Sequence, residues 1–206
     1  MQSYGKSRDN KVLEGLDKFR YMNTQQIAEL YFTTIKNPFQ RQQKTSERMK
    51  KMFDRGYVTR FRFPSEPFIF TIKGNKYSSK INHFMMMVDV WIYLQANRPS
   101  GSVISCEVEV KQDDVITDLV ITYKNNFRNE RKFYYIEVEN ESTGDIIEKI
   151  RKYESLIWQL KAEGIPVGQL VIVYKKQSVK NKIDSKTFEI PIKTIHIAEL
   201  SQKWEW

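Results

Sequence analysis

Cysteine is nearly absent from this chain of 206 residues, because Cys106 is the only one. A single cysteine excludes a disulfide bond within the chain and a zinc site built from cysteines. Proteins that depend on disulfides belong to oxidising compartments, so we expect this protein to be cytoplasmic.

Long apolar runs are also absent. The most hydrophobic segment, residues 83–94, has twelve residues and includes Asp89. A helix that crosses a bilayer needs about 20 apolar residues. Residues 1–10 are polar and lack the apolar stretch of a secretion signal. These absences predict a soluble protein with no membrane partner.

Acidic residues are scarce in the first half of the chain. Residues 1–100 carry 18 Lys and Arg against 8 Asp and Glu, whereas residues 101–206 carry 16 against 17. Clustered positive charge attracts polyanions, while a mixed surface mainly keeps a protein soluble. We therefore expect two domains, residues 1–80 and residues 81–206, of which the first binds nucleic acid.

The apolar pattern of the first domain predicts three helices followed by a hairpin. Asn23 and Gln26 form a capping box at the start of the second helix, and Gly56 allows the third helix to end. The expected elements are helices over about residues 9–21, 23–31 and 40–55, and strands over about residues 57–63 and 68–72. This order is typical of a winged helix-turn-helix domain, whose third helix enters the major groove of DNA.

The third predicted helix carries a stripe of cations. Its members recur every three or four residues and fall within an arc of about 80°. They are Arg41, Lys44, Arg48, Lys51 and Arg55. We expect the stripe to follow the backbone of a DNA duplex, with Arg60 and Arg62 of the hairpin adding contacts. The alternative is a solvated basic face without a ligand.

The second domain is predicted to be an α/β domain with the element order αβββαβ. The expected elements are helices over about residues 81–96 and 143–162, and strands over about residues 103–110, 116–123, 132–139 and 170–173. The last strand should lie parallel to the third, because a helix connects them. The first helix is apolar on most sides, so we expect it to be buried between domains or against a second copy in a homodimer.

Three acidic residues fall within the apolar strands, namely Asp118, Glu137 and Glu139. Alternation along a strand puts Glu137 and Glu139 on the same face. Carboxylates in apolar surroundings are costly unless they bind a metal or are paired. Two interpretations stay open: a metal-dependent active site, or a structural cluster paired with Lys149, Arg151 or Lys152. The roles of Glu107 and Glu109, which share another strand face, also stay open.

The αβββαβ order resembles that of restriction-endonuclease-like nucleases. The resemblance implies that Asp118, Glu137 and Glu139 hold Mg²⁺ and that a lysine orients the attacking water. These nucleases have Asp followed by Glu-x-Lys on the next strand, but Glu139 stands where the lysine belongs. The catalytic set would then be Asp118, Glu137 and a lysine from the following helix, Lys149 or Lys152. Otherwise, the domain is an inactive nuclease scaffold.

Several motifs in this order resemble the replication-relaxation family over nearly the whole chain. They are Tyr57-Val58-Thr59-Arg60-Phe61, Ile81-Asn82-His83, Thr117-Asp118-Leu119-Val120-Ile121, Tyr135-Ile136-Glu137-Val138-Glu139 and Lys149-Ile150-Arg151-Lys152-Tyr153. The resemblance implies a DNA-binding protein of bacterial plasmids or other mobile elements.

Two functions follow as expectations. The first is a homodimeric double-stranded DNA-binding protein, an accessory or regulatory factor in replication or transfer, which needs no cofactor and has replication or transfer proteins as further partners. The second is a Mg²⁺-dependent DNA endonuclease or nickase that the winged helix directs to its target.

Overall fold

The computed structural model of this chain describes residues 4–63, 66–140, 146–204 and 206. Within these ranges the chain is a mixed α and β protein with seven α-helices, one short 3₁₀ helix and two β-sheets. None of the helices in the described ranges is long and apolar enough to span a bilayer. The chain divides into two compact units, Met1–Ile92 and Tyr93–Trp206.

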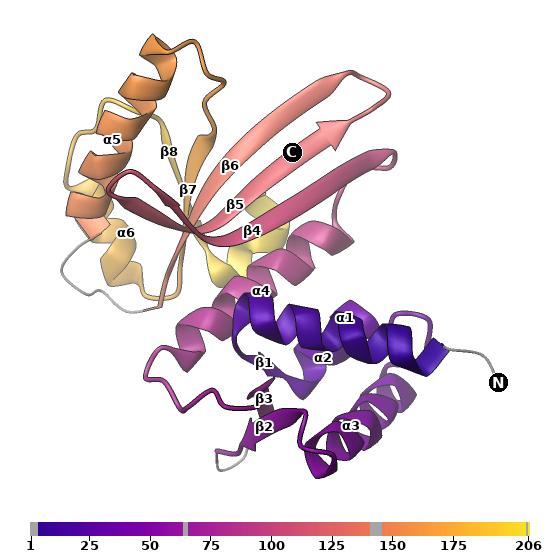
Figure 1. The fold of residues 1–206 in the computed structure, drawn as a ribbon. Helices are drawn as coiled ribbons and strands as arrows, with labels where there is room; N and C mark the ends of the chain where they lie inside the picture. The colour runs from indigo at the N-terminus through magenta and orange to yellow at the C-terminus, as the bar shows by residue number, and fades with distance from the viewer. Residues whose placement is uncertain (1–3, 64–65, 141–145, 205) are drawn as a thin grey trace. The chain divides into compact units, whose positions relative to one another are not determined.

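The first unit contains three helices and a small antiparallel sheet before the start of a fourth helix (Figure 1). Its elements are α1 (Tyr4–Phe19), β1 (Met22–Asn23), α2 (Thr24–Tyr31), α3 (Pro38–Asp54), β2 (Val58–Phe61), β3 (Ile69–Ile72) and α4 (Ile81–Ala96). The strand order is β1-β3-β2. Leu16, Ile27 and Met49, from α1, α2 and α3, are fully buried and form part of the core.

Helix ends in this unit follow local rules. Asn23 and Gln26 form the predicted capping box at the start of α2. Asn37 caps α3 by accepting a hydrogen bond from the Gln40 backbone amide at 3.0 Å, and Pro38 suits the first turn. The helix therefore begins slightly before the predicted residue 40. Gly56 follows α3 with φ of 70°, the left-handed conformation expected of it.

Contacts of α2 with α4 explain where the chain divides. The Gln26 side-chain amide donates hydrogen bonds to the Met85 carbonyl at 2.8 Å and to the Asp89 carboxylate at 2.6 Å. Most of α4 is thus held by the first unit, and the division falls between Ile92 and Tyr93. The sequence analysis placed the domain boundary before residue 81, because no local pattern reveals these long-range contacts.

The second unit is built on a five-stranded sheet with the order β4-β5-β6-β7-β8. Its elements are β4 (Ser102–Gln112), β5 (Val115–Asn125), β6 (Glu130–Glu139), α5 (Ile146–Ala162), β7 (Gln169–Tyr174), α6 (Gln177–Asp184), β8 (Ile192–His196), a 3₁₀ turn (Ile197–Glu199) and α7 (Leu200–Lys203). β4, β5 and β6 form an antiparallel meander, as expected. β7 lies parallel to β6, which confirms the crossover through α5, and β8 lies parallel to β7. The predicted start of the helix at residue 143 lies outside the described residues.

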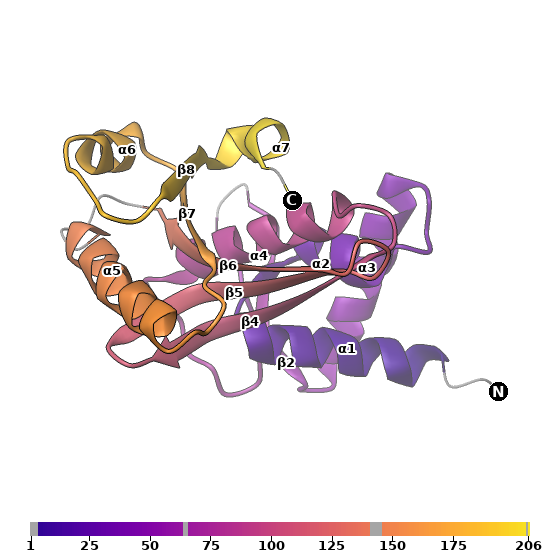
Figure 2. The same ribbon diagram turned by 90° about the horizontal axis from the view of Figure 1, so that it is seen from above.

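Helices α5 and α6 pack against one face of this sheet (Figure 1). Tyr153 and Val179, from α5 and α6, belong to the same apolar cluster as Tyr135 and Leu170 of the sheet. In the view of Figure 2, β8 lies between α6 and α7. On the other face of β6, Tyr134 packs against Trp204 at 5.3 Å between ring centroids. The acidic residues of the strands therefore lie in a sheet that is packed on both faces.

Candidate functional site

The cations of α3 lie beside the buried face of the helix. That buried face consists of Thr45, Met49 and Met52. Residues that are three or four positions apart share a face, so the predicted stripe runs along one edge of the packed surface. Its members differ in burial for this reason: Arg41 and Arg48 are half-buried, whereas Lys44, Lys51 and Arg55 are exposed.

The two half-buried arginines bind other parts of the first unit. Arg41 donates from Nε to the Ile35 carbonyl at 2.9 Å. Arg48 makes a two-point contact with the carboxylate of Asp9 in α1, with 2.7 Å between Nε and Oδ1. The hydrogen bond to Asp9 raises the pKa of the Arg48 guanidinium above its ordinary value. These two side chains anchor α3 to its neighbours and are less available to a ligand than the sequence suggested.

The remaining cations of α3 face solvent. Lys44 pairs with Glu47 at 2.9 Å, but the two side chains are 59% and 46% exposed, so the pair is weak. Lys50, which the stripe did not include, is also exposed. A periodic pattern misses Lys50 because this residue lies one position outside the repeat. The exposed basic set of α3 is therefore Lys44, Lys50, Lys51 and Arg55.

The two hairpin arginines stack on aromatic rings. The Arg60 guanidinium lies 4.2 Å from the ring centroid of Phe53 and 4.8 Å from that of Phe68. Arg62 lies 5.3 Å from the centroid of Phe68. Stacking of this kind holds a guanidinium in place without removing its charge. Arg60 is half-buried and Arg62 is exposed, so Arg62 is the better placed of the two for a ligand.

A cavity of about 270 Å³ adjoins the exposed basic set. Its lining includes Lys44, Arg48 and Lys51 of α3 and also Arg8 of α1, whose guanidinium lies 4.9 Å from the ring centroid of Phe32. Arg8 was not predicted as a site residue. Its distance from α3 along the chain left no sequence pattern that could connect the two.

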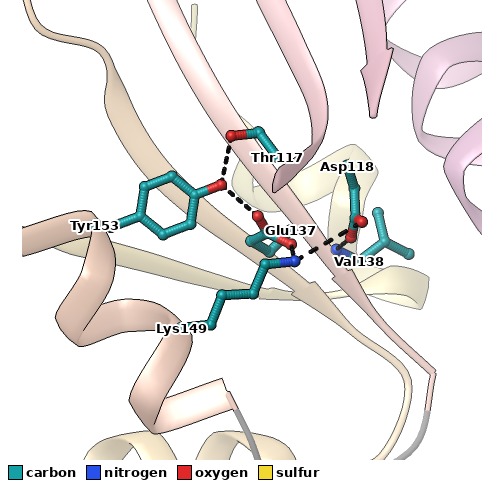
Figure 3. A network of polar contacts seen from close by, with 6 residues as sticks. All are labelled: Thr117, Asp118, Glu137, Val138, Lys149 and Tyr153. Atoms are coloured by element: carbon teal, nitrogen blue, oxygen red, sulfur yellow. Dashed lines mark hydrogen bonds and ion pairs between the residues drawn. The ribbon is translucent and has the colours of Figure 1, made fainter. Parts of the chain in front are cut away.

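A second group of candidate side chains, the polar cluster, lies between the sheet and α5 (Figure 3). It consists of Asp118 on β5, Glu137 on β6, and Lys149 and Tyr153 on α5. The Lys149 ammonium contacts the Glu137 carboxylate and lies 3.9 Å from Asp118 Oδ1. The structure thus brings the predicted catalytic set Asp118, Glu137 and Lys149 together.

Strand register and helix periodicity explain this meeting. Leu119 pairs with Ile136 across β5 and β6, so Asp118 and Glu137 occupy the adjacent position on the two strands. Lys149 and Tyr153 are four residues apart and share a face of α5. Lys152, the other predicted lysine, pairs with Glu148 at 2.9 Å instead.

Each carboxylate of the polar cluster is already hydrogen-bonded. The Tyr153 hydroxyl forms hydrogen bonds with the Thr117 hydroxyl, 2.6 Å away, and with one carboxylate oxygen of Glu137. Lys149 contacts the other Glu137 oxygen. The Val138 backbone amide donates to Asp118 Oδ2 at 2.8 Å. Glu137 is only 1% exposed, so these partners are what make its burial tolerable.

Glu137 and Lys149 of the polar cluster both have raised pKa values. Burial raises the pKa of Glu137 well above its ordinary value, the negative charge of Asp118 adds to this, and Lys149 opposes it. Burial lowers the pKa of Lys149, but the carboxylates of Asp118 and Glu137 outweigh burial and raise it overall. Glu139 adds to the rise in the pKa of Lys149, so three carboxylates stabilise its charged form, whereas burial is the main cause of the raised pKa of Glu137.

Two of the predicted metal ligands, Asp118 and Glu137, have protein partners in this arrangement. Within the described ranges, no three His, Cys, Asp or Glu side chains are grouped so that they could hold a metal ion. Both oxygens of Glu137 are engaged by Tyr153 and Lys149. Glu139 is half-buried at the end of β6. Binding of Mg²⁺ at Glu137 would therefore require displacement of Lys149 or Tyr153.

Glu109 of β4 lies across from Asp118. Val108 pairs with Leu119 and Val110 with Thr117, which puts Glu109 opposite Asp118 in the register. Glu109 has φ of 48°, a left-handed conformation that is strained for a residue with a side chain. The sequence left the roles of Glu107 and Glu109 open. Glu109 lies next to the polar cluster in the strand register, whereas Glu107 is exposed.

Comparisons of this chain with protein-family models, with curated proteins and with solved structures found no match.

Proposed function

We propose that this chain is a double-stranded DNA-binding protein that uses α3 to contact the duplex. The observation that carries the proposal is the exposed basic set of α3, Lys44, Lys50, Lys51 and Arg55. Lys44, Lys51 and Arg55 share one face of α3, and Lys50 lies about 100° around the helix from Lys51. Each contact of such a cation with a phosphate releases bound counterions.

The order of elements around α3 supports this use. α1, α2 and α3 are followed by the antiparallel strands β2 and β3, which is the order of a winged-helix domain. In that reading α3 enters the major groove, and Arg62 of the hairpin contacts the flanking backbone. In this proposal Arg41 and Arg48 orient α3 through their contacts with Ile35 and Asp9.

The biological role is part of the proposal and rests on the resemblance to the replication-relaxation family. We infer an accessory or regulatory factor in the replication or transfer of a plasmid or other mobile element. The second unit would be a restriction-endonuclease-like scaffold, as the order β4, β5, β6, α5, β7 suggests, and α4, most of which belongs to the first unit, would supply the preceding helix. Two copies binding two half-sites would make a homodimer, which sedimentation of the protein with and without DNA tests.

The test of DNA binding compares two double variants with the same change of charge. Lys51→Glu with Arg55→Glu alters the exposed basic set, whereas Lys124→Glu with Arg128→Glu alters exposed residues of the second unit. With a labelled duplex of mixed sequence, we expect the α3 variant to bind at least about tenfold more weakly. The control variant should bind like the wild type. Equal losses in both variants would contradict binding through α3.

The nuclease function remains a second candidate because Asp118, Glu137 and Lys149 lie together. The engagement of Glu137 by Tyr153 and Lys149 weighs against it. Incubation of supercoiled plasmid with the protein and Mg²⁺ or Mn²⁺ tests this candidate. Nicking that stops with a chelator and in Asp118→Ala would establish the enzyme, and intact plasmid under all conditions would favour the inactive scaffold.

A further inference from the structure

A pocket of about 400 Å³ lies in the second unit, where β6 and β7 begin. Its lining combines three cations with three aromatic rings: Arg131, Lys132, Lys193, Phe133, Tyr134 and Trp206. None of the described residues that line it is acidic. Pockets of about 300–1,000 Å³ are of the size that holds small ligands. The polar cluster is a separate site, because Glu137 lies further along β6 and faces α5.

The aromatic rings of the pocket are held in fixed positions. Trp206 stacks on Tyr123 with 5.2 Å between centroids and an angle of 26° between the rings. Its indole nitrogen donates to the Asn97 carbonyl at 2.8 Å. Tyr134 meets the same indole edge-on at 6.2 Å. A rigid aromatic wall loses little entropy when a flat ligand stacks against it.

The cations add an anion-binding character to this wall. The Arg131 guanidinium lies 4.7 Å from the ring centroid of Phe133, which holds it at the pocket. Lys132 pairs with Glu130 at 2.9 Å, so part of its charge is balanced. Lys193 of β8 lines the same pocket from another strand. Arg131, Lys132 and Lys193 are the cations that line the pocket, and Arg131 is the one held there by stacking on an aromatic ring of the lining.

We propose that this pocket binds an unpaired nucleotide, with the base against the aromatic wall and the phosphate near Arg131 and Lys193. Flat aromatic faces together with cations are the combination that binds single-stranded nucleic acid. A base pair inside a duplex offers no free face for such stacking. The ligand is either one nucleotide of a single strand or a free mononucleotide, because both present the same chemistry.

The test uses the full-length chain and a labelled single-stranded oligonucleotide of about ten bases. We expect Arg131→Glu to weaken binding by about tenfold or more, since it replaces an attraction for phosphate by a repulsion. Arg128→Glu makes the same change of charge at an exposed position that does not line the pocket. This control should bind like the wild type.

Tryptophan fluorescence provides a readout that a diffuse charge effect does not produce. Base stacking on Trp206 should quench its emission, and Trp206→Phe should abolish the quench while it keeps an aromatic face for the ligand. Adding dAMP distinguishes the two sources of the ligand. Competition by dAMP supports a mononucleotide pocket, and binding of the oligonucleotide alone supports a single strand.

Two results would overturn the proposal. Equal weakening by Arg131→Glu and Arg128→Glu would show only general attraction between a basic protein and a polyanion. Loss of single-strand binding in Lys51→Glu, with normal binding in Arg131→Glu, would assign the single strand to α3. Neither result depends on duplex binding, so the proposal for this pocket and the proposal for the duplex interface can be refuted separately.

Discussion

At the scale of single residues, Tyr153 explains how Glu137 is accommodated in the core. Tyr153 is 0% exposed, and its hydroxyl joins Thr117 of β5 to Glu137 of β6. A buried carboxylate without such partners would destabilise the folded state by an amount on the order of several kcal/mol. The ring also packs against Tyr135 at 6.0 Å between centroids, so one side chain serves the apolar cluster and the polar cluster.

Replacement of Tyr153 by Phe tests this role. The change keeps the ring and removes only the hydroxyl, which leaves Glu137 and Thr117 each without one partner. We expect the free energy of unfolding to fall by about 1–3 kcal/mol, the usual cost of a buried group left unsatisfied. Urea denaturation of Tyr153→Phe measures this. Tyr57→Phe, at a ring that is 53% exposed, is the matched control and should be neutral. A stable Tyr153→Phe would show that the contact is dispensable.

The raised pKa of Glu137 predicts a dependence of stability on pH. Burial and then Asp118 raise this pKa, so the folded chain holds the proton more firmly than the unfolded chain does. The stabilisation is complete below the ordinary pKa of 4.5 and is lost as the pH rises from there towards the raised value. Asp118→Asn removes the neighbouring negative charge and keeps an oxygen that accepts from the Val138 amide. The variant should therefore lose less stability than the wild type as the pH rises. Unfolding curves at several pH values test this, and parallel curves for both proteins would contradict it.

At the scale of elements, α3 is positioned by Arg41 and Arg48 and exposes its other cations to solvent. Arg48 joins α3 to α1 through Asp9, while Arg41 joins it to the connection after α2 through Ile35. Side chains at the edge of a packed helix face reach neighbouring elements, and those further around the helix reach solvent. A single basic stripe thus divides into an anchoring part and an exposed part.

A double-mutant cycle tests the anchor. We expect Asp9→Ala and Arg48→Ala to show a coupling energy of about 1 kcal/mol or more, because a two-point, partly buried pair is stronger than an exposed one. The exposed pair Lys44–Glu47 provides the comparison, with an expected coupling of about 0.5 kcal/mol or less. Urea denaturation of the single and double variants measures both. Equal coupling in the two pairs would remove the distinction between anchoring and exposed cations.

At the scale of the whole molecule, the positive charge is concentrated in the half that contains α3. The first 100 residues carry 18 basic against 8 acidic side chains, and the remainder is nearly balanced. Such a distribution favours approach of a polyanion to one part of the molecule. Duplex binding should therefore depend strongly on salt.

The salt dependence has an expected size. The exposed basic set of α3 together with Arg62 provides about five phosphate contacts, so the logarithm of the affinity should fall with the logarithm of salt concentration with a slope of about −4 to −5. Fluorescence anisotropy of a labelled duplex at several NaCl concentrations measures this slope. The Lys51→Glu and Arg55→Glu double variant should have a slope smaller by about 2. A slope near zero for the wild type would exclude binding through phosphate contacts.

The elements that local rules govern were predictable from the sequence. The capping box at Asn23 and the end of α3 at Gly56 depend on residues within a few positions of one another. The meander of β4, β5 and β6 follows from alternating strands that short turns connect. The parallel placement of β7 followed from the handedness of a strand–helix–strand connection. Periodicity also predicted that Glu137 and Glu139 share a strand face.

The partners of the charged side chains were decided by the tertiary structure alone. Asp9 meets Arg48 from a different helix, and Lys149, not Lys152, reaches Glu137. Helix and strand periods determine which way a side chain points from its own element, and residues at the edge of a face have several possible neighbours. Which neighbour is within hydrogen-bonding distance depends on how the elements pack, because a charge pairs only over a few ångströms, whatever the separation along the chain.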